Sequence, residues 1–206
     1  LCGGFNSNVI RRAQRFITEE GPKFDKLQFS TVGRRGQAFA KKRGIPSRKD
    51  YAGYLGKLNY GQAKGIADDL IHAYTEGHLD AVYVLYTEFK SAIAQTISLV
   101  RLLPIEPPKL KEKSDGKGHK QAPHLFEPSA KEVLDSLLPR HLATQIWRAL
   151  LESEASEHGA RMTAMDSATK NAKEMIASLT LDYNRARQAA ITKELMEIVS
   201  GAEALK

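Results

Sequence analysis

The last third of the chain carries an apolar pattern with helical spacing that continues for about 65 residues. From Arg140 to Ala204 there is no proline, and the two glycines, Gly159 and Gly201, lie far apart. At about 1.5 Å of rise per residue, the pattern predicts a helix roughly 100 Å long. A compact domain formed by the whole chain would be only about 40 Å across, so we expect the helix to extend beyond any core that the chain builds.

Nine positions of this helix are spaced by alternating steps of three and four residues, as in the heptad seam of a coiled coil. Their side chains are mostly apolar or small, and the seven-residue period predicts left-handed supercoiling with a partner helix. We prefer this interpretation to a helix that covers its own domain, because the seam outlasts any such core. The seam positions are Met162, Met165, Thr169, Ala172, Ile176, Leu179, Tyr183, Ala186 and Ala190.

The apolar stripe changes its position on the helix after Ala190. The spacing continues but starts one residue late, which rotates the stripe by about 100°. Because apolar residues here also lie off the stripe, we expect the tip to enter a socket rather than to fray in water. The second stripe consists of Ile191, Leu195, Ile198, Ala202 and Leu205.

Before the long helix, apolar runs alternate between helix and strand periods, which is typical of an α/β fold with a largely parallel sheet. After a turn at Gly3-Gly4, with Asn6, Ser7 and Asn8 as candidate caps, we predict helices over 9–19, 35–42 and 60–74. Strands are predicted over 27–32, 80–89 and 94–103, the last two antiparallel because residues 90–92 join them tightly.

We predict three parts along the chain: an α/β body over 1–103, a connector over 104–128, and helices over 129–206. The connector contains five prolines and two glycines. Ser129 and Glu132 have the spacing of a capping box for a short helix through Leu138. Pro139 is expected to end or kink that helix, or to lie in the first turn of the long one.

Charge is distributed unevenly along the chain. The net charge is +7, but residues 1–128 hold 21 Lys or Arg against 13 Asp or Glu, and residues 129–206 hold 10 against 11. The basic body would attract an acidic partner, nucleic acid or anionic lipid. No apolar run reaches the length of a membrane span. Cys2 is the only cysteine, which excludes an intrachain disulfide.

The residues do not assemble into a recognisable catalytic motif. Neither glycine-rich phosphate-binding pattern occurs, and the six histidines lack metal-ligand spacing. Asp68-Asp69 and the carboxylates near Glu154 are explained by solvated helix faces. We therefore predict no catalytic residue, cofactor or metal. From spacing alone, the polar residues near the tip also suit a solvated face with i,i+4 pairs.

The C-terminal residues resemble a family signature. Residues 191–204 read I-T-K-E-L-M-E-I-V-S-G-A-E-A and match [IV]-T-x-E-x-x-[DE]-x-x-x-G-A-x-[SAKR], a pattern that resembles the gamma subunit of F-type ATP synthases. Similar likeness is found in A-R-M-T-A-M at 160–165, Y-N-R-A-R-Q-A at 183–189 and L-C-G-G-F-N-S-N at 1–8. The signature positions are Ile191, Thr192, Glu194, Glu197, Gly201 and Ala202.

The resemblance implies an incomplete Rossmann-like body at the foot of a rotor and a C-terminal helix forming half of an antiparallel coiled coil. The other half would be an N-terminal helix that, with a first strand, is expected to be missing from this fragment. The family implies a non-catalytic central stalk that couples proton-driven rotation of the membrane ring to ATP synthesis or hydrolysis at the beta subunits.

The resemblance also implies the contacts of the rotor. Loops of the beta subunits would contact Arg161, Arg187, Gln188, Thr192 and Glu194. The apolar end would turn in a bearing of alpha and beta subunits, and the basic body would face the epsilon subunit and the c-ring. The expected location is peripheral, at the cytoplasmic face of a bacterial inner membrane.

Two alternatives from other classes stay open at this point. The basic body would also fit a nucleic-acid-binding module with a coiled-coil arm, although its basic residues are not interleaved with stacking aromatics. An enzyme whose catalytic half lies upstream is the second alternative.

Overall fold

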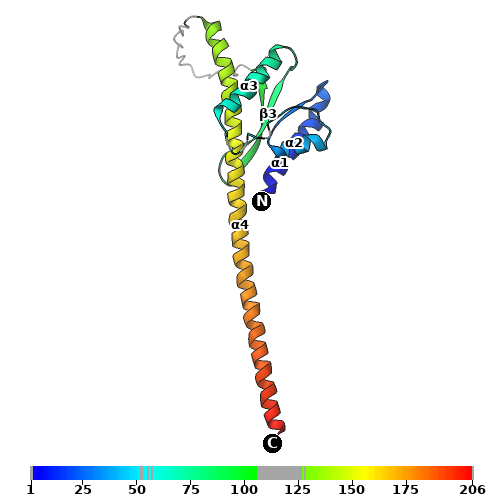
Figure 1. Ribbon diagram of the computed structural model, residues 1–206, viewed down its shortest axis with the longest axis vertical. Coiled ribbons are helices and arrows are strands. Elements are labelled where there is room, and N and C mark those ends of the chain that lie inside the picture. The colour runs from blue at the N-terminus through cyan, green and yellow to red at the C-terminus, as the bar shows by residue number, and fades with distance from the viewer. Residues whose placement is uncertain are drawn as a thin grey trace, which may run out of the picture. The chain divides into compact units, whose positions relative to one another are not determined.

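The computed structural model describes residues 2–51, 53–54, 56, 58–105, 127 and 129–205. They fall into two units: a body unit, Cys2–Ala160, and a helical unit that starts at Arg161 and runs to the C-terminus. One helix, α4, belongs to both units (Figure 1). The elements are α1 (Gly3–Glu19), η1 (Gly21–Lys23), β1 (Phe29–Val32), α2 (Arg34–Lys42), β2 (Ser47–Tyr51), α3 (Tyr60–Thr75), β3 (Val82–Phe89), β4 (Gln95–Leu103) and α4 (Ala130–Ala204).

The strands of the body unit form two two-stranded sheets within the described residues. β1 pairs with β2 in parallel, with Val32 opposite Tyr51, and β3 pairs with β4 in antiparallel fashion, with Leu85 opposite Leu99. The α/β class and the antiparallel final pair are therefore confirmed. The parallel pairing is limited to β1 and β2.

β2 was not predicted, because its sequence, S-R-K-D-Y, is polar and charged. It pairs with β1 through side chains as well as backbone. Thr31 Oγ1 on β1 donates to Asp50 Oδ1 at 2.5 Å, and Ser47 Oγ donates to the same oxygen at 2.9 Å. These hydrogen bonds hold the pKa of Asp50 below its usual value, so the carboxylate stays charged and keeps both partners.

α1 starts six residues before the predicted helix, so the prediction of Asn6, Ser7 and Asn8 as caps is wrong. Cys2 is the N-cap residue, and the Phe5 N–H donates to Cys2 O at 3.1 Å, which closes the first turn there. The asparagine at position 8 accepts a hydrogen bond from Arg11 instead. The local turn therefore takes the place of a side-chain cap.

α3 confirms the predicted helix and ends where expected. Asn59 caps its start, accepting from the Gln62 N–H at 2.9 Å while the Gln62 side chain accepts from the Asn59 N–H at 3.1 Å. This capping box was not predicted. After the helix, Gly77 adopts φ +74°, a left-handed conformation that a side chain disfavours.

The core of the body unit lies between α3, β4 and the first part of α4. Most of the large buried side chains come from α4 and β4, and two of the three from α3 are alanines. Trp147 on α4 adds an edge contact to Tyr60, with ring centroids 6.3 Å apart. The core residues are Tyr51, Ala63, Ile66, Ala67, Leu102, Leu103, Leu142, Ala143, Ile146 and Leu150.

α4 runs unbroken through Pro139, so the structure has no separate short helix before the long one. The residues after the proline explain why: Leu142 and Ala143 are each 2% exposed, and their burial favours continuing the helix into the core. Ser129 does cap the helix, accepting from the Glu132 N–H at 3.2 Å, as predicted. The predicted connector lies almost entirely outside the described residues.

Further along, small residues of α4 pack against β3 and the turn after it. Ser156 is fully buried, and its hydroxyl donates to Thr87 O at 3.2 Å, while the Thr87 N–H donates to Ser153 Oγ at 3.4 Å. At Gly159, an added Cβ would lie 3.2 Å from the Phe89 ring and 3.3 Å from Ala92 Cα. This close approach fixes the helix on the β3–β4 hairpin.

Candidate interaction surface on the C-terminal helix

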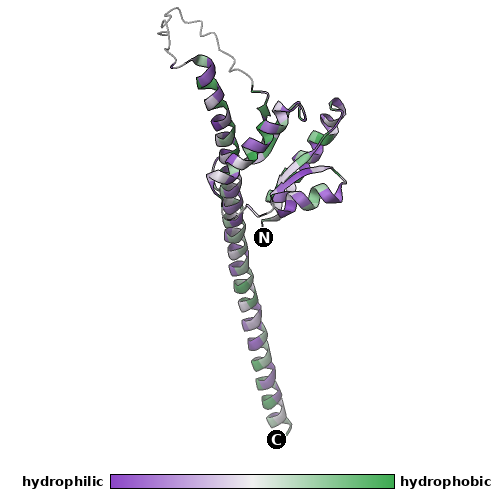
Figure 2. Ribbon diagram, turned by 45° about the horizontal axis from the view of Figure 1, so that its top comes forward, coloured by the Kyte–Doolittle hydropathy of each residue, from purple (hydrophilic) through white to green (hydrophobic). Residues whose placement is uncertain are grey.

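The helical unit, where the structure describes it, consists of the part of α4 from Arg161 onward, roughly 65 Å of helix. All nine seam positions are exposed. Ile176, Leu179 and Tyr183 are 62%, 61% and 67% exposed. Figure 2 shows apolar and polar residues alternating along this part of α4. The predicted long helix is therefore confirmed, with its seam uncovered.

Thr169 is the one seam position with an aliphatic hydroxyl group. That hydroxyl donates to Met165 O one turn earlier, at 2.8 Å. Because the hydrogen bond satisfies the hydroxyl within the helix, the threonine presents its methyl group to the seam. A polar residue at this position is thus compatible with a close apolar contact to a partner helix.

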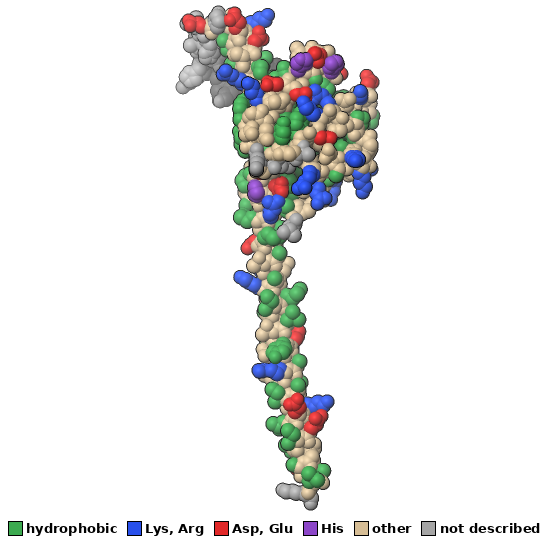
Figure 3. All heavy atoms as spheres, in the orientation of Figure 1, with side chains coloured by type: hydrophobic (Ala, Val, Ile, Leu, Met, Phe, Trp, Pro, Cys, Tyr) green, Lys and Arg blue, Asp and Glu red, His purple; other side chains and the backbone are tan. Residues whose placement is uncertain are grey.

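The second stripe is exposed as well. Ile198 is 72% exposed, and Ile191 and Leu195 are more than half exposed. Figure 3 shows apolar side chains along the drawn face of this helix, with charged ones between them. Burying each large side chain in a partner would contribute about 1–2 kcal/mol, so the stripe is a strong docking surface.

Four of the predicted contact residues flank the second stripe. Counting about 100° per residue, Arg187 and Glu194 lie on one side of it, and Gln188 and Thr192 lie on the other. All four are exposed. Arg187 and Glu194 are about 10 Å apart along the helix axis. The structure therefore brings this polar set together around one apolar stripe.

The same four residues make no ion pair or side-chain hydrogen bond with any part of the chain that the structure describes. Neighbouring charged residues do pair: Arg185 lies 3.9 Å from Asp182, and Lys193 lies 3.7 Å from Glu197. Such exposed pairs contribute little to stability. The polar set thus keeps its hydrogen-bonding groups available for a partner, which the sequence alone did not reveal.

Arg161 is not close to the other four residues. It lies 26 positions before Arg187, which corresponds to about 39 Å along the helix axis, and it is partly buried. If it contacts a partner, that contact is separate from the surface formed by the other four. Gly201 and Ala202 of the signature are exposed on the last turns.

Two other features, a metal-binding cluster and a membrane-spanning helix, are absent from the described residues. These residues contain no group of three or more His, Cys, Asp or Glu side chains placed to hold a metal ion. None of their helices combines the length and apolarity needed to cross a membrane. The body unit does contain a hollow lined by arginines, which the sequence did not predict.

An α/β body joined to a long helix with an uncovered heptad seam defines a protein that is completed by partner subunits. Comparison with known proteins identifies the class further: the family model described as ATP synthase matches residues 1–205. The chain belongs to the ATP synthase gamma chain family.

Its relatives are similar over the whole chain. The ATP synthase gamma chain of Anaeromyxobacter sp. (strain Fw109-5) is 54% identical over 206 residues, covering 100% of this chain and 69% of the relative. That of Geotalea daltonii is 50% identical over 207 residues, covering 100% of this chain and 70% of the relative. The nucleic-acid-binding alternative gains no support from these matches.

Solved structures share the fold. The Euglena gracilis mitochondrial ATP synthase (OSCP, F1 and c-ring, rotational state 3) contains a chain with a TM-score of 0.63 and 21% identity, covering 99% of this chain and 68% of that one. A chain of the central stalk and c-ring structure from Tetrahymena thermophila has a TM-score of 0.60 and 23% identity, covering 82% of this chain and 70% of that one.

Proposed function

We propose that this chain is the central rotor subunit of an ATP synthase, which couples rotation of the membrane ring to ATP synthesis or hydrolysis at the beta subunits. Gamma chains of this family are subunits of an enzyme complex. In this proposal the chain itself makes and breaks no covalent bond. It transmits torque through α4 and is otherwise non-catalytic.

The observation that carries the proposal is the polar set on α4. Arg187, Gln188, Thr192 and Glu194 are exposed and unpaired in the described chain, and they surround an apolar stripe. Charge-assisted hydrogen bonds from such groups can form in one orientation of the helix and break in the next. An asymmetric contact of this kind is what a rotating shaft requires to distinguish one beta subunit from another.

The remaining surfaces suggest the other partners. The seam from Met162 to Ala190 would be covered by a second, antiparallel helix of the rotor, and the stripe beyond it would turn against alpha and beta subunits. The basic body would face the epsilon subunit and the c-ring. Such a protein would be peripheral, at the cytoplasmic face of a bacterial inner membrane.

The test uses the assembled complex with the gamma chain carrying this sequence. We expect Arg187→Ala together with Gln188→Ala to slow ATP hydrolysis about tenfold, because each change removes a hydrogen bond that stabilises one rotor orientation. Lys193→Ala is the charge-matched control, since Lys193 lies about 200° around the helix from Ile191, on the side away from the second stripe. Assembly of each variant is checked by size-exclusion chromatography.

ATP hydrolysis that is indifferent to the double change, in a fully assembled complex, would contradict the coupling assignment. Equal slowing by Lys193→Ala would also contradict it, because the effect would then follow helix charge rather than the polar set.

A further inference from the structure

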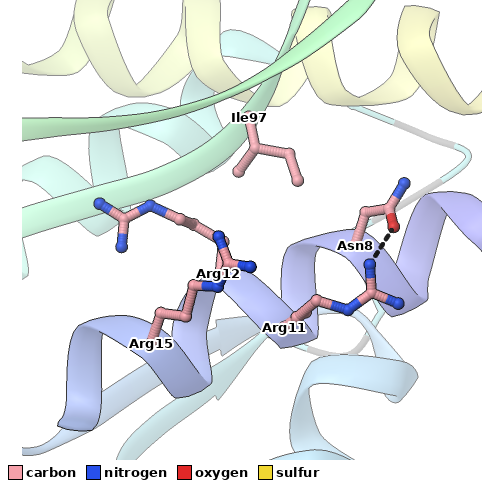
Figure 4. A pocket seen from close by; sticks show the side chains of 5 residues that line it. All are labelled: Asn8, Arg11, Arg12, Arg15 and Ile97. Carbon is pink, nitrogen blue, oxygen red and sulfur yellow. Dashed lines mark hydrogen bonds between the residues drawn. The ribbon is translucent and has the colours of Figure 1, made fainter. Parts of the chain in front are cut away.

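One face of α1 carries three arginines at a hollow in the body unit. Asn8, Arg11, Arg12 and Arg15 fall within about 100° of the helix circumference, and so share one side of it. With Ile97 of β4 they line a hollow of about 220 Å³. In Figure 4, Ile97 reaches from β4 toward α1, and Arg11 lies against Asn8. The hollow has room for several water molecules or a small anion.

No carboxylate among the described residues neutralises the positive charge at this hollow. None of the three arginines forms an ion pair with a carboxylate in the described residues, and no acidic side chain lines the hollow. Arg11 donates to Asn8 Oδ1 at 3.4 Å, a contact with a neutral group. Arg12 is half-buried. Like charges at these spacings destabilise a helix, so an anion bound between them would relieve a repulsion that the fold itself leaves in place.

The chemistry of the lining selects among anions. Each guanidinium offers a planar fork of donors that matches the oxygens of a phosphate group, and a phosphate group has enough acceptor oxygens to engage several arginines at once. A single carboxylate has two oxygens and one charge, which suits one guanidinium. No aromatic side chain lines the hollow, so there is no platform on which a nucleobase would stack.

We propose that this hollow between α1 and β4 binds a phosphate group, held by Arg11, Arg12 and Arg15. The group can belong to a free anion, such as inorganic phosphate or pyrophosphate, or to the headgroup of an anionic lipid. The site lies in the body unit, and it does not depend on the proposed rotor function.

The test measures binding of inorganic phosphate and pyrophosphate to the chain by isothermal titration calorimetry, at constant ionic strength set with chloride. We expect saturable binding of pyrophosphate with a Kd of about 1 mM or tighter. Flotation with phosphatidylglycerol vesicles, against phosphatidylcholine vesicles, forms the second arm. Binding to free anions alone assigns a soluble ligand, and binding to phosphatidylglycerol alone assigns a lipid phosphate.

The variant Arg11→Gln, Arg12→Gln, Arg15→Gln should weaken binding at least about tenfold. Its control is Lys41→Gln, Lys42→Gln, Arg43→Gln at the end of α2, which removes the same charge elsewhere in the body unit. Arg12→Lys retains the charge and loses the planar fork, and should weaken binding several-fold. This milder change decides the matter if the triple variant fails to fold.

Absence of saturable binding in both arms would overturn the proposal. Equal weakening by the two triple variants would overturn it too, because binding would then reflect net charge and not the arginines at the hollow. If the triple variant is unfolded, unchanged affinity of the Arg12→Lys variant for pyrophosphate would also overturn the proposal.

Discussion

Gly159 is the position where the packing of α4 on the body can be tested most sharply. It is buried in the middle of a helix, where glycine is normally a poor choice, and the change Gly159→Ala would ordinarily stabilise the helix by about 1 kcal/mol. Here the added Cβ would lie 3.2 Å from Phe89 Cε2, 3.3 Å from Ala92 Cα and 3.4 Å from Ala92 O. The phenyl ring can shift, but the backbone at Ala92 cannot move without disturbing the β3–β4 turn.

The gain in helix propensity and the steric overlap oppose each other, and their relative sizes decide whether Gly159→Ala stabilises or destabilises the protein. Overpacking a close contact costs about 1–3 kcal/mol, so after the gain in helix propensity we expect a net destabilisation of about 1 kcal/mol. Gly65 provides the matched control, because it lies in α3, is exposed and has no atom within 4 Å of its added Cβ. Gly65→Ala should therefore stabilise the protein by up to about 1 kcal/mol.

The assay is urea-induced unfolding followed by circular dichroism, with the body unit's tryptophan fluorescence as a second probe. Trp147 lies one turn from Leu150 in the core and reports on the packing of α4 there. The account predicts midpoints that move in opposite directions in the two variants. A Gly159→Ala variant stabilised as much as Gly65→Ala would show that α4 does not approach the hairpin as closely as described.

Three further predictions concern polar contacts of the body unit. Asp69 binds Arg48 at 2.5 Å and Lys49 at 3.2 Å, and its hydrogen bond with Arg48 lowers its pKa. The stabilisation that this carboxylate gives the folded protein is therefore present above its unfolded-state pKa and is lost as pH falls through its folded-state pKa. In urea titrations, Asp69→Asn should lower the free energy of unfolding by about 1 kcal/mol at pH near 7 and by less at pH near 3. An equal loss at both pH values would contradict this. Asn59→Ala should destabilise α3 by about 1 kcal/mol and Asn59→Ser by much less, measured by thermal unfolding; identical losses would exclude the capping role. Burial raises the pKa of Tyr51 to about 12, so the stabilisation from its protonated form is complete below the unfolded-state pKa of about 10 and is lost as pH rises through the folded-state pKa. In an absorbance titration the Tyr51→Phe variant should lack a transition near pH 12 that the unsubstituted protein shows; loss of a transition near pH 10 instead would refute the burial.

Periodicity predicted α3 and α4 because their apolar residues face a core or a seam at regular helical spacing. Ala63, Ile66 and Ala67 are buried as their spacing indicates. β2 could not be predicted in this way, because its side chains are polar and its pairing depends on Asp50 meeting Thr31 across the two strands. The break predicted at Pro139 is absent for a related reason: the tendency of proline to end a helix is outweighed by the burial of Leu142 and Ala143.

For the candidate sites too, some features follow from helical spacing and others depend on the three-dimensional structure. Helical spacing alone places Arg187 and Gln188 on opposite sides of the second stripe. That these residues lack partners in the described chain is a property of the structure. The arginine hollow depends on α1 meeting β4, elements separated by about eighty residues in the chain, so no local pattern could have indicated it.

The central claim, that this chain turns as a rotor, is tested most directly by observing rotation. A bead attached through Lys41→Cys in the body unit, with Cys2 replaced by serine, would report the motion of the gamma chain in an immobilised complex with alpha and beta subunits. The account predicts unidirectional rotation during ATP hydrolysis. Sustained ATP hydrolysis with a bead that stays fixed relative to the alpha and beta subunits would contradict it.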